Sequence, residues 1–463
     1  MYNIRFGTDG WRAIIAKDFT VENVNRVAEA SCKWLKQRGF HKVVIGHDCR
    51  FGGQMFLEEI ACTFANEGIQ CLIARGFVST PMVSLGVLQN AAHLGVVITA
   101  SHNPASYNGY KLKSSLGGPL LPKGIAEIEA LIPAEAKLRE MDFESCLKNG
   151  LIEYIDLEAA YIHHVQSHFD LQKIRTNVSL AYDAMYGAGQ NVMKQIYPEM
   201  VPFHCHYNPG FENLPPEPIE RNLQEIMKFL AKHPGQFIGV ANDGDADRLA
   251  FIDSKGNMVD SHHVLLLLLY YLVVYKKQTG AVVVSFSVTN KLKKLADHFG
   301  LECIITKIGF KYIAEYMTTK EVLVGGEESG GLAIKGHIPE RDGIWIALTL
   351  LQYIAETGKT LEELIDEVYQ IVGPFYYDRW DLSLSEYQIN LVKESLHNGI
   401  SEWGNQKVLI EENLDGYKYH FQNDRWLLIR TSGTEPVLRI YAQAENKQEV
   451  LNLLNQARAV LKV

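Results

Sequence analysis

Three times along the chain, a short apolar run gives way to a polar or glycine-containing turn and then to a segment with apolar positions at helical spacing. The apolar runs are residues 43–45, 178–182 and 282–284, and the turns after them begin GHDCR, DAMYGAG and SFSVTNKL. Buried strands followed by helices in this order are typical of parallel sheets built from βαβ units. The pattern therefore predicts three α/β domains.

The pattern changes after Gly373 and Pro374, which interrupt the alternation of strands and helices. Residues 417–421 and 426–429 are strand-like, and residues 447–461 have helical spacing. We expect a smaller α+β domain at this end of the chain. With hydrophilic steps near residues 149–157 and 253–257 as the other boundaries, the predicted domains cover residues 1–148, 149–253, 254–372 and 373–463.

Composition agrees with a globular protein of several domains. The chain has 463 residues, of which 47% are hydrophobic, and that length is sufficient for large buried cores. The longest apolar run, residues 264–274, is too short to span a bilayer and is interpreted as a buried helix. The first residues, MYNIRFGTDG, lack an apolar signal core, so no membrane association is expected.

The cysteines and the net charge bear on the expected location of the protein and on its expected partners. The seven cysteines are scattered without CxxC spacing, which fits reduced thiols and predicts a cytoplasmic location. The net charge of −9 argues against nucleic acid as a partner, because binding a phosphate backbone needs a broad basic surface. An acidic small-molecule substrate would instead have to meet local cations.

The first candidate for a functional site is TASHNP, residues 99–104, which directly follows the apolar run 94–98. A buried strand that ends in such a turn exposes its hydroxyl at the carboxyl end of a sheet, where α/β proteins tend to bind ligands. Ser101 is therefore a candidate nucleophile.

A second segment, NDGDADR at residues 242–248, places Asp243, Asp245 and Asp247 at alternate positions between two apolar stretches. In extended backbone, alternate side chains point to one side. Three carboxylates held together repel each other and favour a cation among them, and an all-oxygen set suits Mg²⁺, Ca²⁺ or Mn²⁺ better than zinc. A hard-metal site is predicted.

Two later loops carry polar groups suited to sugars and phosphates. GGEESGG, residues 325–331, offers Glu327 and Ser329 as hydrogen-bonding partners for sugar hydroxyls, with glycines that permit close backbone approach. RTSGTEP, residues 430–436, combines the guanidinium of Arg430 with hydroxyls and backbone amides, the groups that hold a phosphate dianion. Both loops follow strand-like segments.

Together the four loops resemble the signature set of the α-D-phosphohexomutase superfamily, in the order phosphoserine loop, metal loop, sugar loop and phosphate loop. FGTDGWR at residues 6–12 and GHDCRFGG at residues 46–53 also look like that family's first domain. PERDG at residues 339–343 and the GEESGG loop most resemble the bacterial phosphoglucomutase/phosphomannomutase group.

The resemblance implies a fold of three similar α/β/α domains, with mixed or parallel sheets, and a C-terminal α+β domain around a central cleft. It implies a phosphohexomutase that interconverts hexose 1-phosphate and hexose 6-phosphate, with glucose favoured and mannose possible. The reaction would pass through a phosphoserine and a hexose 1,6-bisphosphate that also serves as activator. Mg²⁺ is the implied cofactor and a phosphosugar the only implied partner, while the oligomeric state stays open.

The resemblance also implies roles for individual residues. Phosphoryl transfer depends on positioning and charge stabilisation, for which the candidate catalytic residues are Ser101, His102, Lys111 and Arg248. Burial near cations is expected to lower the pKa of Lys111 toward working pH, as a general acid/base requires. The candidate metal ligands are Ser101, Asp243, Asp245 and Asp247. The candidate substrate-binding residues are Arg12, Lys307, Glu327, Ser329, Arg430, Ser432, Gly433 and Thr434.

Several alternatives remain. A phosphoglucosamine mutase or a phosphopentomutase would use the same chemistry on another sugar, because a few hydrogen bonds decide which sugar is accepted. A haloacid-dehalogenase-like phosphatase could use the Asp-x-Asp of Asp245 and Asp247 with an aspartyl nucleophile. That interpretation leaves the RTSGTEP loop without a function. A non-catalytic sugar-phosphate sensor is the third alternative.

Overall fold

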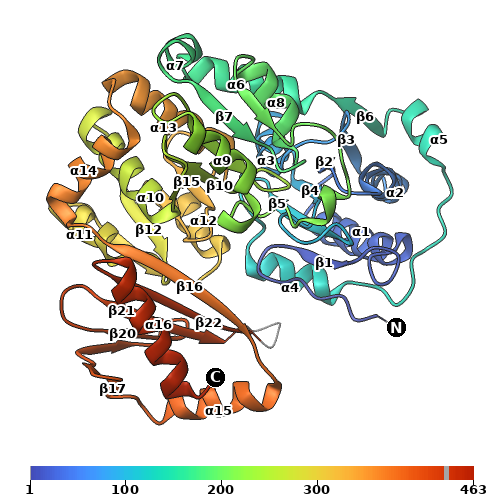
Figure 1. Cartoon of the computed structure of the whole chain (residues 1–463). Coiled ribbons are helices and arrows are strands. Elements are labelled where there is room, and N and C mark those ends of the chain that lie inside the picture. The colour runs from blue at the N-terminus through green and yellow to red at the C-terminus, as the bar shows by residue number, and fades with distance from the viewer. Residues whose placement is uncertain (1, 432–436) are drawn as a thin grey trace.

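The computed structural model describes residues 2–431 and 437–463. Four main sheets follow one another along the chain, each with its own helices. Figure 1 shows the first two domains, blue to green, beside the yellow and orange third domain, with the orange-to-red fourth domain next to the third. The predicted arrangement of three α/β/α domains followed by an α+β domain is confirmed.

Domain 1 is built on a mixed sheet in the order β1-β5-β4-β2-β3-β6. Strands β2, β3, β4 and β6 are parallel, while β5 and β1 complete the sheet antiparallel. The strands are β1 (Trp11–Ile14), β2 (Lys42–His47), β3 (Gln70–Ala74), β4 (Leu94–Ile98), β5 (Tyr107–Ser114) and β6 (Ile152–Ile155). The helices are α1 (Val21–Lys36), α2 (Gly53–Asn66), α3 (Thr80–Gln89), α4 (Pro122–Ala130) and α5 (Phe143–Lys148).

Domains 2 and 3 repeat this plan with smaller sheets, ordered β11-β10-β9-β7-β8 and β13-β12-β14-β15. In each, three parallel strands are followed by an antiparallel strand, β10 or β15. The elements of domain 2 are α6 (Leu157–His168), α7 (Leu171–Asn177), β7 (Leu180–Asp183), α8 (Gly189–Ile196), β8 (Val201–Phe203), α9 (Gln224–Lys232), β9 (Ile238–Asn242), β10 (Leu249–Ile252) and β11 (Met258–Val259). Those of domain 3 are α10 (Ser261–Tyr270), β12 (Ala281–Ser285), α11 (Asn290–His298), β13 (Cys303–Thr306), α12 (Phe310–Thr319), β14 (Val322–Gly326), β15 (Leu332–Ile334), α13 (Gly343–Thr357) and α14 (Leu361–Val372).

Domain 4 has an antiparallel sheet in the order β16-β22-β21-β20-β19, packed against α16. Strand β21 does not alternate between buried and exposed positions. Its residues 426–429 are all buried, because the sheet is covered on both faces. The elements are β16 (Tyr376–Ser383), α15 (Glu386–His397), β17 (Glu402–Trp403), β18 (Gln406–Lys407), β19 (Ile410–Glu412), β20 (Tyr417–His420), β21 (Trp426–Thr431), β22 (Val437–Ala444) and α16 (Lys447–Leu461).

Two sheets run past the boundaries expected from the sequence. Strand β6 pairs in parallel with β3, so the first sheet extends beyond residue 148 to Ile155. Strand β11 pairs with β10, so the second sheet extends beyond residue 253 to Val259. Both are edge strands in hydrophilic stretches, and their backbone pairing leaves little trace in the composition.

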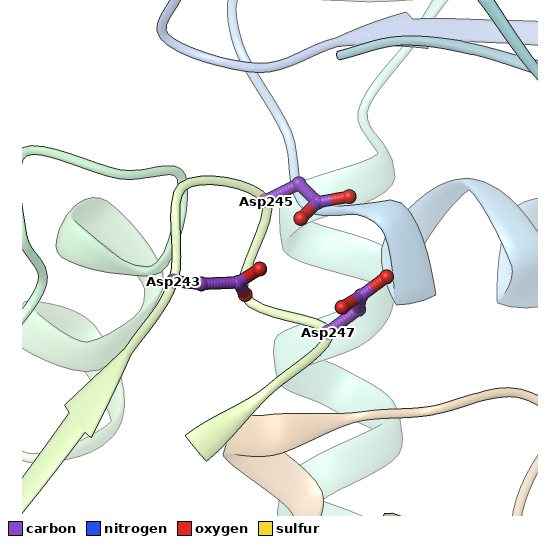
Figure 2. Close-up of side chains that lie close together, drawn as sticks. All are labelled: Asp243, Asp245 and Asp247. Atoms are coloured by element: carbon purple, nitrogen blue, oxygen red, sulfur yellow. The ribbon is translucent and has the colours of Figure 1, made fainter. Parts of the chain in front are cut away.

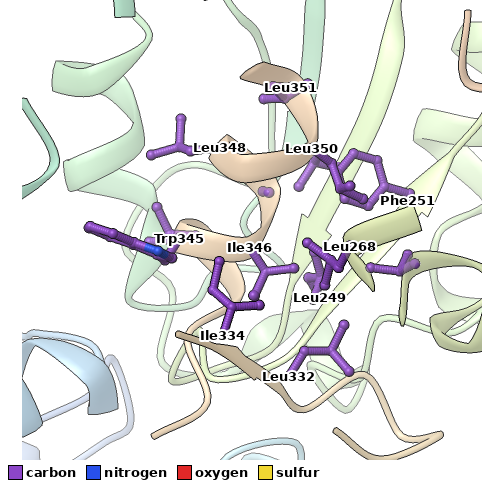
Figure 3. Close-up of a cluster of buried hydrophobic side chains, with 14 of the residues drawn as sticks. Leu249, Phe251, Leu268, Leu332, Ile334, Trp345, Ile346, Leu348, Leu350 and Leu351 are labelled. Atoms are coloured by element: carbon purple, nitrogen blue, oxygen red, sulfur yellow. The ribbon is translucent and has the colours of Figure 1, made fainter. Parts of the chain in front are cut away.

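One continuous apolar core joins the first three domains. Its buried side chains come from β2 and α3 of domain 1, from β7, β9 and β10 of domain 2, and from α10 and α13 of domain 3. Figure 3 shows the part where α13 packs between β10 and β15, with Leu249, Ile334 and Leu348 among the buried side chains. Asp342 caps the N-terminus of α13 and accepts a hydrogen bond from the Trp345 amide at 3.0 Å. The domains carrying the candidate chemistry are therefore packed as one unit.

Three observations concern features noted in the sequence: the apolar runs, the cysteines and the segment 264–274. Within residues 2–431 and 437–463, no helix combines the length and the apolar character that crossing a membrane requires. All seven cysteines, which lie in the described part of the chain, are free thiols. The apolar run 264–274 forms the buried helix α10 and a following π-helical turn.

Candidate active site

The serine of TASHNP lies where β4 ends, in a strained turn. Ser101 is buried and has a φ of +50°, in the left-handed region that non-glycine residues rarely adopt. Its amide donates to Thr99 Oγ1 at 2.8 Å, and its own Oγ donates to Asp243 Oδ2 at 2.6 Å. The structure thus joins the end of a domain 1 strand to the aspartate turn of domain 2.

Arg50, which the sequence analysis did not single out, holds this turn in shape. Its Nη2 donates to the carbonyls of Ser101 and Asn103, both at 2.6 Å. The partner of Arg50 is the buried carboxylate of Asp48, at 3.3 Å from Nε, which also accepts from Thr99 Oγ1 at 2.5 Å. Burial raises the pKa of Asp48 to about 6, although Arg50 acts against that shift. The buried ion pair of Arg50 and Asp48 therefore holds the serine turn in place.

The three aspartates gather on the turn between β9 and β10. Figure 2 shows their carboxylates pointing toward one another, and one ligand atom from each lies within 4.8 Å of the others. The backbone here is a turn rather than the extended strand assumed from the alternation, and Ala246 within it has a φ of +55°. A side chain on Gly244 would meet the Ser101 carbonyl, since its Cβ would lie 2.5 Å from that oxygen. The glycine therefore lets the two turns touch.

The donor set fits a hard cation. Asp245 Oδ1 and Asp247 Oδ1 are buried and make no hydrogen bond within the described chain. Burial and the two neighbouring carboxylates raise the pKa of Asp243 well above its ordinary value. Buried carboxylate oxygens without partners are costly, and a divalent cation with oxygen preference would satisfy them. Asp243, Asp245 and Asp247 can therefore hold Mg²⁺.

Lys111, from β5, lies against the same carboxylates. Its Nζ is 2.7 Å from Asp245 Oδ2, 3.0 Å from Asp247 Oδ2 and 2.7 Å from Asp9 Oδ2. Burial lowers the pKa of Lys111, but the three carboxylates outweigh burial and hold the pKa above its ordinary value. The expected lowering of this pKa is wrong, because the neighbours that matter are anions rather than cations.

Two further residues, neither predicted from the sequence, complete this cluster. Arg341 Nη2 lies 2.5 Å from Asp9 Oδ2 and 2.7 Å from Asp247 Oδ2, and it comes from the loop before α13. Thr80, the first residue of α3, donates its hydroxyl to Asp245 Oδ2 at 2.5 Å. Asp9 and Arg341 lie within FGTDGWR and PERDG, two motifs already noted in the sequence. Their charge within these motifs was the feature that could have indicated a role in the site.

The remaining candidates near the serine are His102, Arg12 and Arg248. The imidazole Nδ1 of His102 lies 3.3 Å from Ser101 Oγ, and burial together with nearby arginines lowers its pKa well below the ordinary value. Arg12 donates from Nη1 to Asn103 Oδ1 at 2.6 Å. The Arg248 amide donates to Asp243 Oδ1 at 3.0 Å. All three therefore contact the serine turn or the aspartate turn.

The glycine-rich loop of domain 3 lies beside the aspartate turn. The amide of Leu249 donates to the Gly330 carbonyl at 3.2 Å, so β10 and this loop touch directly. Glu327 is buried, and its Oε1 accepts from the Gly309 amide at 2.8 Å. Burial raises the pKa of Glu327 to about 7, against the effect of Arg341. Ser329, on the same loop, is half-buried.

The last candidates lie toward domain 4. Arg430, at the end of β21, is half-buried, and its Nε lies 3.2 Å from Asp415 Oδ1. Lys307 is exposed, next to the loop that meets domain 4 at Ile308. Ser432, Gly433 and Thr434 lie outside the described residues.

Comparison with known proteins gives the same division of the chain. The family models for phosphoglucomutase/phosphomannomutase match in order: alpha/beta/alpha domain I over residues 3–139, domain II over 159–256, domain III over 260–372 and the C-terminal domain over 400–460. Fold and matched models together define a class of enzyme, the intramolecular phosphotransferases that act as phosphomutases.

Individual relatives match over almost their whole length. A phosphoglucomutase/phosphomannomutase of Thermococcus kodakarensis is 30% identical, covering 97% of this chain and 96% of that protein. A phosphoglucosamine mutase of Methanococcus maripaludis is also 30% identical, covering 99% and 98%. A crystal structure from Thermus thermophilus, whose protein carries the provisional name phosphomannomutase, has 34% identity and a TM-score of 0.88 over all of both chains. The chain belongs to the phosphoglucomutase/phosphomannomutase family, within the α-D-phosphohexomutase superfamily.

Proposed function

We propose that this protein interconverts hexose 1-phosphates and hexose 6-phosphates, with glucose as the favoured sugar and mannose accepted. The observation that carries the proposal is the 2.6 Å contact between Ser101 Oγ and Asp243, within a buried cluster that fits Mg²⁺. A phosphoryl group on Ser101 would lie against cations from three domains, and charge stabilisation of this kind is the main contribution to phosphoryl transfer.

In this mechanism, phospho-Ser101 donates its phosphoryl group to the free hydroxyl of the sugar phosphate. The bond from phosphorus to the serine oxygen breaks, a bond to the sugar oxygen forms, and a hexose 1,6-bisphosphate results. After the bisphosphate reorients, its other phosphoryl group returns to Ser101 and the isomeric monophosphate leaves. Bound Mg²⁺, on Asp243, Asp245 and Asp247, would supply charge neutralisation for the transferring group.

The surrounding residues divide the remaining tasks. Lys111 Nζ lies against Asp245, Asp247 and Asp9, and we assign to it the transfer of a proton to the serine oxygen as that oxygen leaves. His102 Nδ1 lies 3.3 Å from Ser101 Oγ, and we assign it a helper role in this proton transfer. Arg248 and Arg12 would contact the transferring phosphoryl group. Glu327, Ser329 and Lys307 would bind the sugar, and Arg430 with Ser432, Gly433 and Thr434 the distal phosphate.

Replacement of the serine tests this mechanism. Ser101→Ala should reduce mutase turnover by at least roughly 10³-fold, because the group that carries the phosphoryl is lost. Ser106→Ala, an exposed serine on the same turn, is the matched control and should leave turnover unchanged. Full activity in Ser101→Ala would contradict the proposal, and release of inorganic phosphate as main product would indicate a phosphatase.

A phosphoglucosamine mutase is the second candidate, because a relative of that name matches as well as the glucose and mannose enzyme does. The GEESGG loop favours the glucose and mannose reading. Catalytic efficiency on glucose, mannose and glucosamine 1-phosphates, with trace hexose 1,6-bisphosphate present, separates the candidates. The proposal expects the highest kcat/KM with glucose 1-phosphate, and a preference for glucosamine 1-phosphate would replace it with the second candidate.

A further inference from the structure

A carboxylate of domain 4 bridges the two loops that we assign to substrate. Asp415 lies between β19 and β20, with its side chain 23% exposed. Its Oδ1 is 3.2 Å from Arg430 Nε, within domain 4, and its Oδ2 accepts from the Ile308 amide of domain 3 at 2.9 Å. Asp415 thus contacts the arginine of the phosphate loop and the backbone of another domain at the same time.

The contact with domain 3 continues directly to the sugar loop. Ile308 is followed by Gly309, whose amide donates to Glu327 Oε1 at 2.8 Å. A series of polar contacts therefore runs from Arg430 through Asp415 and the backbone at 308–309 to Glu327. Each of the three hydrogen bonds in this series is accepted by a carboxyl group, of Asp415 or Glu327.

The backbone next to Asp415 is shaped for this contact. Gly416 has a φ of +98°, and a Cβ there would lie 2.6 Å from the Ile429 carbonyl and 3.1 Å from Arg430 Cβ. Only glycine allows the turn to lie this close to β21. Asp415 is therefore held beside Arg430 by the fold of the turn as well as by its charge.

We propose that Asp415 is a positioning residue, which orients Arg430 for the distal phosphate of the substrate and ties that orientation to Glu327 on the sugar loop. The inference rests on the proposed function, in which Arg430 binds phosphate and Glu327 binds the sugar. Since Asp415 touches neither reacting group, its loss should weaken substrate binding and sugar discrimination more than the chemical step.

Domain 4 has other polar bridges to domain 3, and one of them supplies a matched control. Asp424 Oδ2 lies 2.9 Å from Lys291 Nζ, so it also joins the two domains through a carboxylate. Asp424 contacts Lys291 of α11 and is not part of the series of contacts through Ile308. Asp424→Asn likewise removes the charge of a carboxylate that joins domain 4 to domain 3, and it leaves the path from Arg430 to Glu327 intact.

Steady-state kinetics of Asp415→Asn and Asp424→Asn, with glucose and mannose 1-phosphates, tests the proposal. In Asp415→Asn the amide can still accept from Ile308, but the charge facing Arg430 is lost. We expect KM to rise roughly 10-fold, kcat to change by less than about 3-fold, and the ratio of kcat/KM between the two sugars to fall. Asp424→Asn should retain the KM and sugar preference of the unmodified protein.

A double-mutant cycle keeps the proposal falsifiable if Asp415→Asn also loosens the fold. In an Arg430→Lys background, Asp415→Asn should add little to KM, because the orientation it would disturb is already lost. The proposal is overturned if Asp415→Asn matches Asp424→Asn, or if its effect and that of Arg430→Lys simply add. Absence of turnover of every hexose phosphate by the unmodified protein would instead refute the proposed function.

Discussion

The first three domains and domain 4 are held in place in different ways. Domains 1 to 3 share one apolar core, and the buried cluster around Asp243 joins turns from all three. Domain 4 has a core of its own, and it meets domain 3 through a small apolar cluster around Trp426 and several polar bridges. Polar contacts exchange with water more readily than a packed core does. The candidate reaction centre is thus built on the domains that share a core, and Arg430 lies on the domain that meets them largely through polar contacts.

The largest expected effect comes from changing the reaction centre itself. Asp247→Asn, or removal of divalent cations by a chelator, should lower kcat by roughly 10²-fold or more, because charge on the transferring group is no longer neutralised. Arg430→Lys should chiefly raise KM. Assays with and without EDTA, followed by return of Mg²⁺, measure the first effect. Undiminished kcat after complete removal of divalent cations would contradict the metal assignment.

Paired core substitutions sharpen the comparison of the two cores. Leu348 of α13 and Leu454 of α16 are both fully buried, the first in the shared core and the second in the core of domain 4. Each change to alanine should cost about 2–5 kcal/mol of unfolding free energy. Hydrogen exchange should show Leu454→Ala weakening the protection of domain 4 amides alone. If both variants lowered protection over the whole chain equally, the two regions would form a single cooperative unit.

A smaller effect is expected at the interface of domain 4. Lys418 is buried over Trp426, and its Nζ donates to the Phe286 carbonyl at 3.0 Å. Burial lowers the pKa of Lys418 to about 8, so the unfolded chain binds this proton at higher pH than the folded protein does. Stability should therefore fall as pH decreases from about 10.4 to about 8, by on the order of 3 kcal/mol.

Denaturant unfolding across this pH range, in the unmodified protein and in two variants, checks the prediction. Lys418→Met should remove the pH-dependent loss, since no proton is taken up at that position. Lys293→Met, at an exposed lysine of α11, serves as the control and should retain the pH-dependent loss of stability. Identical pH profiles for all three proteins would show that Lys418 is not the group responsible.

Much of this architecture could be predicted from the sequence, because periodicity reports which residues are buried. The strands 417–420 and 426–431 and the helix 447–461 lie where the pattern placed them. The short strands β6 and β11 could not be predicted, since backbone pairing at a sheet edge needs no particular side chain.

At the candidate site, the sequence indicated which side chains matter but not how charges pair across domains. The aspartate trio and Ser101 were predicted to form one site; in the structure the three carboxylates lie together and Ser101 Oγ donates to Asp243. The predicted pKa of Lys111 was wrong because the carboxylates of Asp245, Asp247 and Asp9, brought together by the fold, all contact its ammonium group. Arg50, Arg341 and Asp415 act through partners that only the folded chain brings near them.

The central claim is that Ser101 carries the phosphoryl group during turnover. The most direct test is mass spectrometry of peptides from protein incubated with glucose 1,6-bisphosphate and Mg²⁺. The account predicts one added phosphoryl group on the peptide that contains Ser101, and its removal on addition of excess glucose 1-phosphate. An active protein that carried its phosphoryl group on another residue, or on none, would contradict the account.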